Sequence, residues 1–330
     1  MNIKIAFLLL VFIFLIFPSY SQNLKPIKVI FDTDMGPDYD DVGAIALLHA
    51  FADEGKVDIL ATIASTKYEG VGGVLDVLNT YFGRPDLPIG IPTGKAIAQK
   101  DWQHWTDTLL VKYPHSLRRN AEAPDAVALY RKILAAQPDE SVTLITVGFL
   151  TNISNLLQST ADEFSPLSGI DLVRKKVVRL ISMAGKFPEG SEFNVNQDPK
   201  SSQVVVSKWP KEVIYSGFEI GEKIHSGIPL IQNEQIIDSP VKDVFALSIP
   251  MAKEDENGRM SWDQTAVWVA ALGHEKYFGL EEGEMKVADD GSNTWDLAGQ
   301  GQFRLVVKDN LRGLEMKIND LMMHQPKNRR

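Results

Sequence analysis

The segment Asp32-Thr33-Asp34-Met35-Gly36-Pro37-Asp38-Tyr39-Asp40-Asp41 is the most informative stretch of this sequence. It follows a short β-rich run, residues 26–32 (PIKVIFD), and precedes a helical pattern that starts at about Asp41. Five carboxylates fall within these ten residues. Two carboxylates about 5 Å apart repel by roughly 3 kcal/mol at an effective dielectric of 20, so such a cluster indicates a bound cation. Oxygen ligands without sulfur favour Ca²⁺ or Mg²⁺.

Other interpretations of this acidic segment are weaker. A solvated turn is one of them, and Asp40 or Asp41 also suits a helix cap. An EF-hand loop needs Glu at its twelfth position, which counted from Asp32 is Gly43. Phosphatases with an aspartyl nucleophile also carry Asp-x-Asp after a first strand, but they usually continue with Thr or Val where this chain has Met35-Gly36.

Strand and helix patterns alternate along the rest of the chain. Continuous apolar runs separated by helical stretches of 10–15 residues predict an α/β fold with a doubly wound, mostly parallel sheet flanked by helices. Residues 95–122 are too irregular for a plain connection and predict either a lid or a surface excursion. The apolar runs are residues 57–64, 87–94, 141–148, 177–185 and 212–217, and the helical patterns include residues 41–51, 71–83, 124–137 and 263–272.

Composition excludes several classes of protein. Apolar residues make up 44% of the 330 residues and charged residues 23%, which is typical of a folded globular chain. The net charge of −9 argues against a nucleic-acid partner, because phosphate neutralisation needs clustered Lys and Arg. The absence of cysteine rules out disulfide scaffolds, zinc ribbons and thiol nucleophiles.

The N-terminus has the pattern of a secretory signal. Residues 5–17 are 13 consecutive apolar positions behind Lys4, short of the roughly 20 that a transmembrane helix needs. Ser19 and Ser21 fit cleavage after Ser21. We therefore expect a signal peptide at residues 1–21, a single domain at residues 22–330, no membrane span after signal removal, and a periplasmic or secreted protein. An uncleaved signal anchor is the alternative.

The acidic segment resembles that of the nucleoside hydrolases, the inosine–uridine-preferring family. Their first strand ends in Asp-Thr-Asp-x-Gly, and a paired Asp-Asp then opens a helix; here the loop between them is two residues longer than the shortest family version. Three further matches follow in the family's order. They are Gly148-Phe149-Leu150-Thr151-Asn152, then Met183-Ala184-Gly185 with Glu192-Phe193-Asn194, and finally Trp262-Asp263.

The resemblance implies a role for each matched residue. Asp34, Asp41 and Asp263, with the backbone carbonyl of Val147, would hold one Ca²⁺, and Asp34 would also act as general base toward the attacking water. Ribose hydroxyls would bind Asp40, Glu192 and Asn194. Met183 and Phe193 would form an apolar wall near the sugar, unless they are core residues.

The implied activity is calcium-dependent hydrolysis of the N-glycosidic bond of a small-molecule ribonucleoside to free base and ribose, as in purine salvage. Family members that tolerate pyrimidines tend to carry His immediately before the last metal-binding Asp, where this chain has Trp262. An indole can stack on a base, so we expect a purine preference, with Trp102 or Trp105 as an opposite wall; a core anchor is the alternative role of Trp262.

Lys186 stands where the family often has Asn, which puts recognition of the 5′ end of the ribose in doubt. A catalytically weak nucleoside- or sugar-binding protein, or a hydrolase of another ribosyl compound, is the alternative function. The role of Asp38 and a homo-oligomeric state stay open.

Overall fold

A computed structural model of the chain describes residues 25–308 and 310–326. The predicted signal peptide, residues 1–21, lies outside them. Within the described ranges, no helix combines the length and the apolar character that a bilayer crossing requires.

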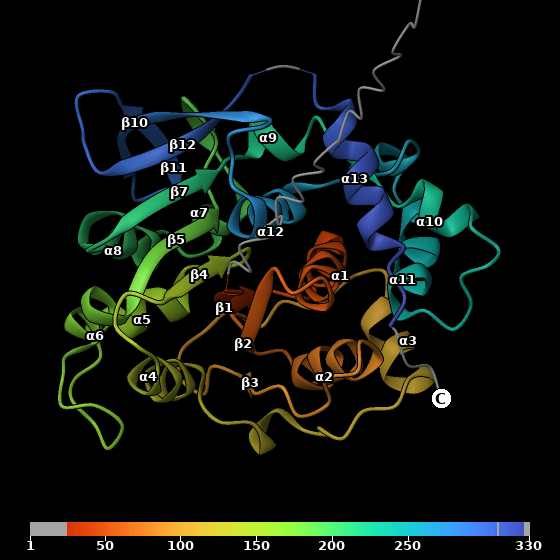
Figure 1. Cartoon of the computed structure of the whole chain (residues 1–330), viewed down its shortest axis with the longest axis horizontal. Coiled ribbons are helices and arrows are strands. Elements are labelled where there is room, and N and C mark those ends of the chain that lie inside the picture. Colours follow the sequence, from red (N-terminus) through yellow and green to blue (C-terminus); the bar gives the residue numbers. More distant parts are fainter. Residues whose placement is uncertain (1–24, 309, 327–330) are drawn as a thin grey trace, which may run out of the picture.

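The described part of the chain contains one large sheet with the strand order β3-β2-β1-β4-β5-β7-β12-β10-β11-β6 (Figure 1). Pairing is parallel from β3 through β12, and β10, β11 and β6 extend this sheet by antiparallel pairing. The chain winds from β1 toward β3 on one side and through β4, β5 and β7 on the other, so the predicted doubly wound, mostly parallel α/β fold is confirmed. The strands are β1 Ile27–Thr33, β2 Val57–Ala64, β3 Ile89–Gly90, β4 Val142–Thr146, β5 Val177–Met183, β6 Glu189–Ser191, β7 Glu212–Ser216, β10 Phe278–Val287, β11 Ser292–Asp296 and β12 Gln302–Val307, with the small pair β8 His225–Ser226 and β9 Arg259–Met260 apart from this sheet.

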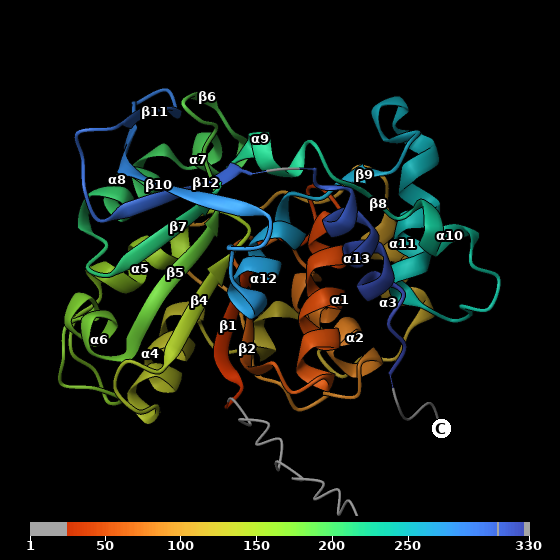
Figure 2. The same cartoon turned by 45° about the horizontal axis from the view of Figure 1, so that its top comes forward.

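Helices cover both faces of the sheet (Figure 2). Successive residues of β1 point to opposite faces: Val29 and Phe31 pack with α1, α12 and α13, whereas Ile30 packs with α4, α5 and α6. This double burial explains why the central strands are continuous apolar runs. The α-helices are α1 Asp40–Asp53, α2 Val71–Tyr81, α3 Trp105–Lys112, α4 Ala126–Ala136, α5 Thr151–Gln158, α6 Gly169–Lys176, α7 Phe193–Gln197, α8 Pro199–Lys208, α9 Phe218–Gly221, α10 Ile228–Gln232, α11 Pro240–Ser248, α12 Trp262–Leu272 and α13 Arg312–Met322.

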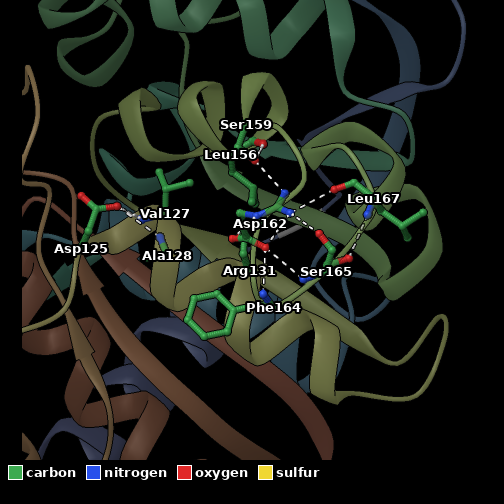
Figure 3. A network of polar contacts seen from close by, with 10 residues as sticks. All are labelled: Asp125, Val127, Ala128, Arg131, Leu156, Ser159, Asp162, Phe164, Ser165 and Leu167. Carbon is green, nitrogen blue, oxygen red and sulfur yellow. Dashed lines mark hydrogen bonds and ion pairs between the residues drawn. The ribbon is translucent and has the colours of Figure 1, made fainter.

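A buried arginine fixes α4 to the connection between α5 and α6 (Figure 3). The Arg131 guanidinium donates to both carboxylate oxygens of Asp162, at 2.7 and 3.0 Å, to the Ser159 hydroxyl, and to the carbonyls of Ser165 and Leu167. Such a fork is the geometry in which Arg–carboxylate hydrogen bonds are strongest. The neighbouring residue on α4, Tyr130, is thereby held against the end of β1.

Two sequence expectations differ from the observed elements. The apolar run 87–94 forms only the two-residue strand β3, because Pro88 and Pro92 have no N–H to donate to a ladder. The irregular segment 95–122 contains α3, which packs on α2 and α11.

Candidate active site

The loop after β1 has a conformation that its residues enforce. Gly36 has φ +154°, and a Cβ there would lie 2.6 Å from Cε1 of Tyr68, so no larger residue fits without movement. The Tyr68 hydroxyl donates to the Met35 carbonyl at 3.0 Å. The Thr33 hydroxyl accepts from the Met35 N–H at 3.0 Å and donates to the Asp41 carboxylate. These contacts turn the chain sharply and direct the following carboxylates to one place.

A cavity of about 230 Å³ lies where β1, β4, β5 and β7 end. Carboxyl ends of strands at the switch point of a doubly wound sheet are where such folds bind ligands. A larger hollow, about 750 Å³, lies at the amino ends of β1, β4 and β5, but its lining carries a single carboxylate, Glu140. The smaller cavity is lined by Asp34, Asp38, Asp40, Val147, Met183, Glu192, Phe193, Asn194, Phe218, Arg259, Trp262 and Asp263.

Carboxylates converge in this cavity. Oxygen atoms of Asp38, Asp40 and Asp263 lie within 4.8 Å of one another, and Asp34 lines the same space. Burial, reinforced by repulsion from neighbouring carboxylates, raises the pKa of Asp34, Asp40, Asp41 and Asp263 well above the usual range. Buried hard-oxygen donors that repel each other in this way fit a divalent cation such as Ca²⁺.

Asp40 joins two helices that are far apart in the sequence. It is the first residue of α1, and its Oδ2 accepts from the backbone N–H groups of Trp262 and Asp263, at 3.0 and 3.2 Å. A carboxylate at this position satisfies free N–H groups in the first turn of α12 and complements the helix dipole. Asp40 therefore fixes the backbone that carries Asp263 into the cavity.

Glu192 and Asn194 lie together at the start of α7. The Glu192 carboxylate accepts from the backbone N–H groups of Gly185, Asn194 and Val195 at 2.7–3.2 Å. Burial nevertheless raises the pKa of Glu192 to about 7. The Asn194 amide donates to the Val147 carbonyl at 3.0 Å, which brings the backbone oxygen predicted as a calcium ligand into the same network.

Asp32 lies near the carboxyl end of β1, two residues before Asp34 of the cavity lining. Its Oδ2 accepts from the Tyr130 hydroxyl at 2.8 Å and from the Asn152 amide at 3.0 Å, and its Oδ1 has no hydrogen-bond partner among the described residues. Burial raises the pKa of Asp32 to about 7. Asp32 thus connects α4 and the first turn of α5 to the strand that precedes the acidic loop.

The structure brings nearly all the sequence-predicted site residues to one cavity. Asp34, Asp263 and Val147 from the predicted calcium set line it, as do all six residues predicted to contact substrate. Asp41 is buried next to the cavity, where its carboxylate accepts from Thr33, but it is not one of the lining residues. Neither Trp102, which is exposed, nor Trp105, which is buried, is part of the lining, so the proposed opposite wall is not formed by them.

Three lining residues were given no role by the sequence analysis. Asp38 was visible within the acidic segment, but no local pattern marked Phe218 or Arg259. The Trp262 indole N–H donates to the Phe218 carbonyl at 2.9 Å, and the two rings lie 5.0 Å apart. Arg259 lies three residues before Trp262 in the sequence. This spacing alone does not distinguish an arginine that lines a cavity from one on the surface.

Fold and cavity together define a doubly wound α/β protein with a carboxylate-rich site at its switch point. Residues 29–313 match the sequence model of the family described as "Inosine-uridine preferring nucleoside hydrolase". The chain belongs to this nucleoside hydrolase family.

Individual relatives are distant. A pyrimidine-specific ribonucleoside hydrolase RihA from a Shewanella species is 27% identical over 237 residues, covering 68% of this chain and 66% of that protein. The inosine-uridine preferring nucleoside hydrolase of Crithidia fasciculata is 23% identical over 225 residues, covering 65% and 67%. The match thus spans about two thirds of each relative. Among solved structures, a purine-preferring ribonucleoside hydrolase from Gardnerella vaginalis has a TM-score of 0.68 at 17% identity, covering 90% of this chain and 99% of that one. This last likeness supports the fold.

Proposed function

We propose that the protein hydrolyses the N-glycosidic bond of ribonucleosides with the help of bound Ca²⁺, releasing free base and ribose. The observation that carries this proposal is the convergence of buried carboxylates with Glu192 and Asn194 in one cavity at the switch point of the sheet. Membership of the nucleoside hydrolase family supports the same chemistry. The catalytic domain would span residues 22–330.

We assign each residue of the proposed machinery the task that its match to the family motifs implies. Asp34, Asp41, Asp263 and the Val147 carbonyl would hold the cation. When bound, Ca²⁺ would supply a positive charge that orients the attacking water and lowers its pKa. Asp34 would accept the proton of that water.

The ribose would be bound by other residues of the same cavity lining. Asp40, Glu192 and Asn194 would bind its hydroxyls. Cleavage passes through a sugar with oxocarbenium character, so these negative groups stabilise the positive charge that develops on the ring. Met183 and Phe193 would exclude water from its apolar face.

A purine preference is the finer part of the proposal. Its support is the large indole surface of Trp262 in the cavity lining and the absence of histidine among the described residues of that lining. The names of the relatives include both pyrimidine-specific and purine-preferring enzymes, so they do not decide the preference.

The alternative is a nucleoside-binding protein with weak or no catalysis, or a hydrolase of another ribosyl compound. Lys186 supports this alternative function, because its ammonium lies 4.8 Å from the ring centre of Phe218, a residue of the cavity lining. A cation at this rim would alter recognition of the sugar.

The test is a panel of inosine, guanosine, adenosine, uridine and cytidine, assayed for free base with calcium and with excess chelator. We expect purine nucleosides to be cleaved faster, no turnover after chelation, and neither turnover nor calcium binding in Asp34→Ala. Asp58→Asn, an exposed aspartate on β2, is the matched control. Turnover unaffected by the chelator would contradict the calcium dependence, and equal or faster cleavage of uridine would contradict the purine preference. Binding without turnover would favour the alternative.

Export is proposed from the N-terminal sequence alone. Cleavage after Ser21 gives a mature chain that starts at Gln22, in the periplasm or outside the cell. The intact mass of the exported protein tests this, and a full-length chain in the membrane fraction would indicate an anchor.

A further inference from the structure

An arginine forms part of the cavity lining between two aromatic rings. Arg259, on β9, has only 13% of its side chain exposed, and its guanidinium carbon lies 5.0 Å from the ring centres of both Tyr39 and Trp262. The Tyr39 hydroxyl is fixed in turn by a 2.6 Å hydrogen bond to Asp255. This packing gives the guanidinium one defined position, over the rings of both Tyr39 and Trp262.

The acidic groups around Arg259 do not use all of its donors. Nη2 lies 3.2 Å from Asp38 and 3.5 Å from Asp40, and Nη1 lies 3.6 Å from Asp255. A guanidinium carries five N–H donors, and Nε–H has no acceptor among the described residues. A buried donor without an acceptor is unfavourable, so an acceptor supplied by a ligand would complete the site.

We propose that Arg259 donates a hydrogen bond to the departing nucleobase, at an acceptor next to the glycosidic nitrogen, and stabilises the negative charge that the base gains. This inference rests on the proposed function and names the group that assists the leaving base. The acceptor is ring nitrogen N3 of a purine or the 2-carbonyl oxygen of a pyrimidine. Phe218 and Trp262 line the same cavity as Arg259 and add aromatic surface that suits the ring of such a base.

The reaction balances without proton transfer from Arg259. The bond between C1′ and the base nitrogen breaks with its electron pair on the base, and the hydroxyl of water forms the new bond to C1′. The remaining proton of the water passes to Asp34 and then, through solvent, to the base. Arg259 stays protonated because its guanidinium is not deprotonated in proteins, so it acts by charge and hydrogen bonding alone.

This role predicts selectivity for the leaving group. Bases that depart as nitrogen anions, such as guanine, hypoxanthine and uracil, gain from a fixed cation near the glycosidic nitrogen. A base that departs without negative charge gains little. N7-methylated guanosine is such a case, because its imidazole ring is already cationic and becomes neutral when the bond breaks.

The experiment compares guanosine with 7-methylguanosine in the wild type, Arg259→Gln and Arg259→Lys. Loss of one preorganised donor costs about 10²–10³-fold in kcat. We expect Arg259→Gln to lose about that factor in kcat with guanosine and less than about tenfold with 7-methylguanosine. Arg259→Lys keeps the charge among the three carboxylates and should show the same selective loss, reduced in size. Arg179→Gln, a half-exposed arginine paired with Glu212 at the opposite end of the sheet, is the matched control.

Calcium titration and thermal unfolding establish that each variant is folded and loaded; if Arg259→Gln fails to fold, Arg259→Lys provides the comparison. Equal losses with both substrates would mean that Arg259 acts through Asp40 and the ribose, and would overturn the proposal. Unchanged kcat with guanosine would also overturn it. A wild type that releases base from neither substrate would instead refute the proposed function, and this role with it.

Discussion

Replacement of Asp32 by Asn should stabilise the protein at alkaline pH and not at acidic pH. Asp32 is fully buried, and its pKa rises from 3.8 to about 7 because burial disfavours the charged carboxylate. The native state therefore holds a proton over a pH range in which the unfolded chain has released it. Stability consequently falls as the pH rises from about 4 to about 7.

The size of the effect follows from the two pKa values. At about 1.36 kcal/mol per pKa unit, the raised pKa of Asp32 lowers the stability of the native state, relative to an aspartate whose pKa stays at 3.8, by about 2 kcal/mol at pH 5.5 and about 4 kcal/mol at pH 8. An Asn at this position keeps an oxygen that can accept from Tyr130 and Asn152, and it does not ionise. Its amide replaces Oδ1, which has no partner, and a buried unpaired donor costs about 1–3 kcal/mol at either pH.

The difference in unfolding free energy between Asp32→Asn and the wild type should therefore shift by about 2 kcal/mol in favour of the variant between pH 5.5 and pH 8. Urea unfolding followed by tryptophan fluorescence, in excess chelator at both pH values, measures this difference. Asp58→Asn, whose aspartate is exposed, should give the same small difference at both pH values. A difference that is independent of pH in Asp32→Asn, or that shifts toward the wild type at pH 8, would refute the reasoning.

Three further outcomes are expected. Gly148→Ala places a Cβ 2.3 Å from the backbone nitrogen of Asp34, so calcium affinity should fall about 10–100-fold in calorimetric titration, and an unchanged affinity would contradict this coupling. Trp262→Ala should lose about 10–100-fold in kcat/KM for inosine while it still binds calcium; a retained kcat/KM would show that the indole is only a core anchor. Arg131→Met leaves the Asp162 carboxylate without its fork of donors and should lower the unfolding free energy by about 3 kcal/mol, measured by urea unfolding, with calcium affinity unchanged.

The sequence determined the central part of the fold. Strand β2 coincides with the predicted run 57–64, because a strand buried on both faces is mostly apolar and is then easy to recognise; only Asp58, near its start, is exposed. Strand β10, residues Phe278–Val287, was not predicted, since it carries four charged residues and a glycine at its centre. Its place in the sheet depends on antiparallel pairing with β12 and β11, which no local apolar pattern reveals.

The sequence also located the chemistry, because the acidic loop, Glu192, Asn194 and Asp263 occur in short motifs that can be recognised one by one. Only the tertiary structure showed that Arg259 meets Asp38 and Asp40, which precede it by more than 200 residues, and that Asp40 holds the first turn of α12. Hydrogen bonds and propensities within a few residues leave a pattern in the sequence. Contacts between distant segments arise only when the packed sheet brings loop, helix and strand ends together, so their residues look ordinary until the chain is folded.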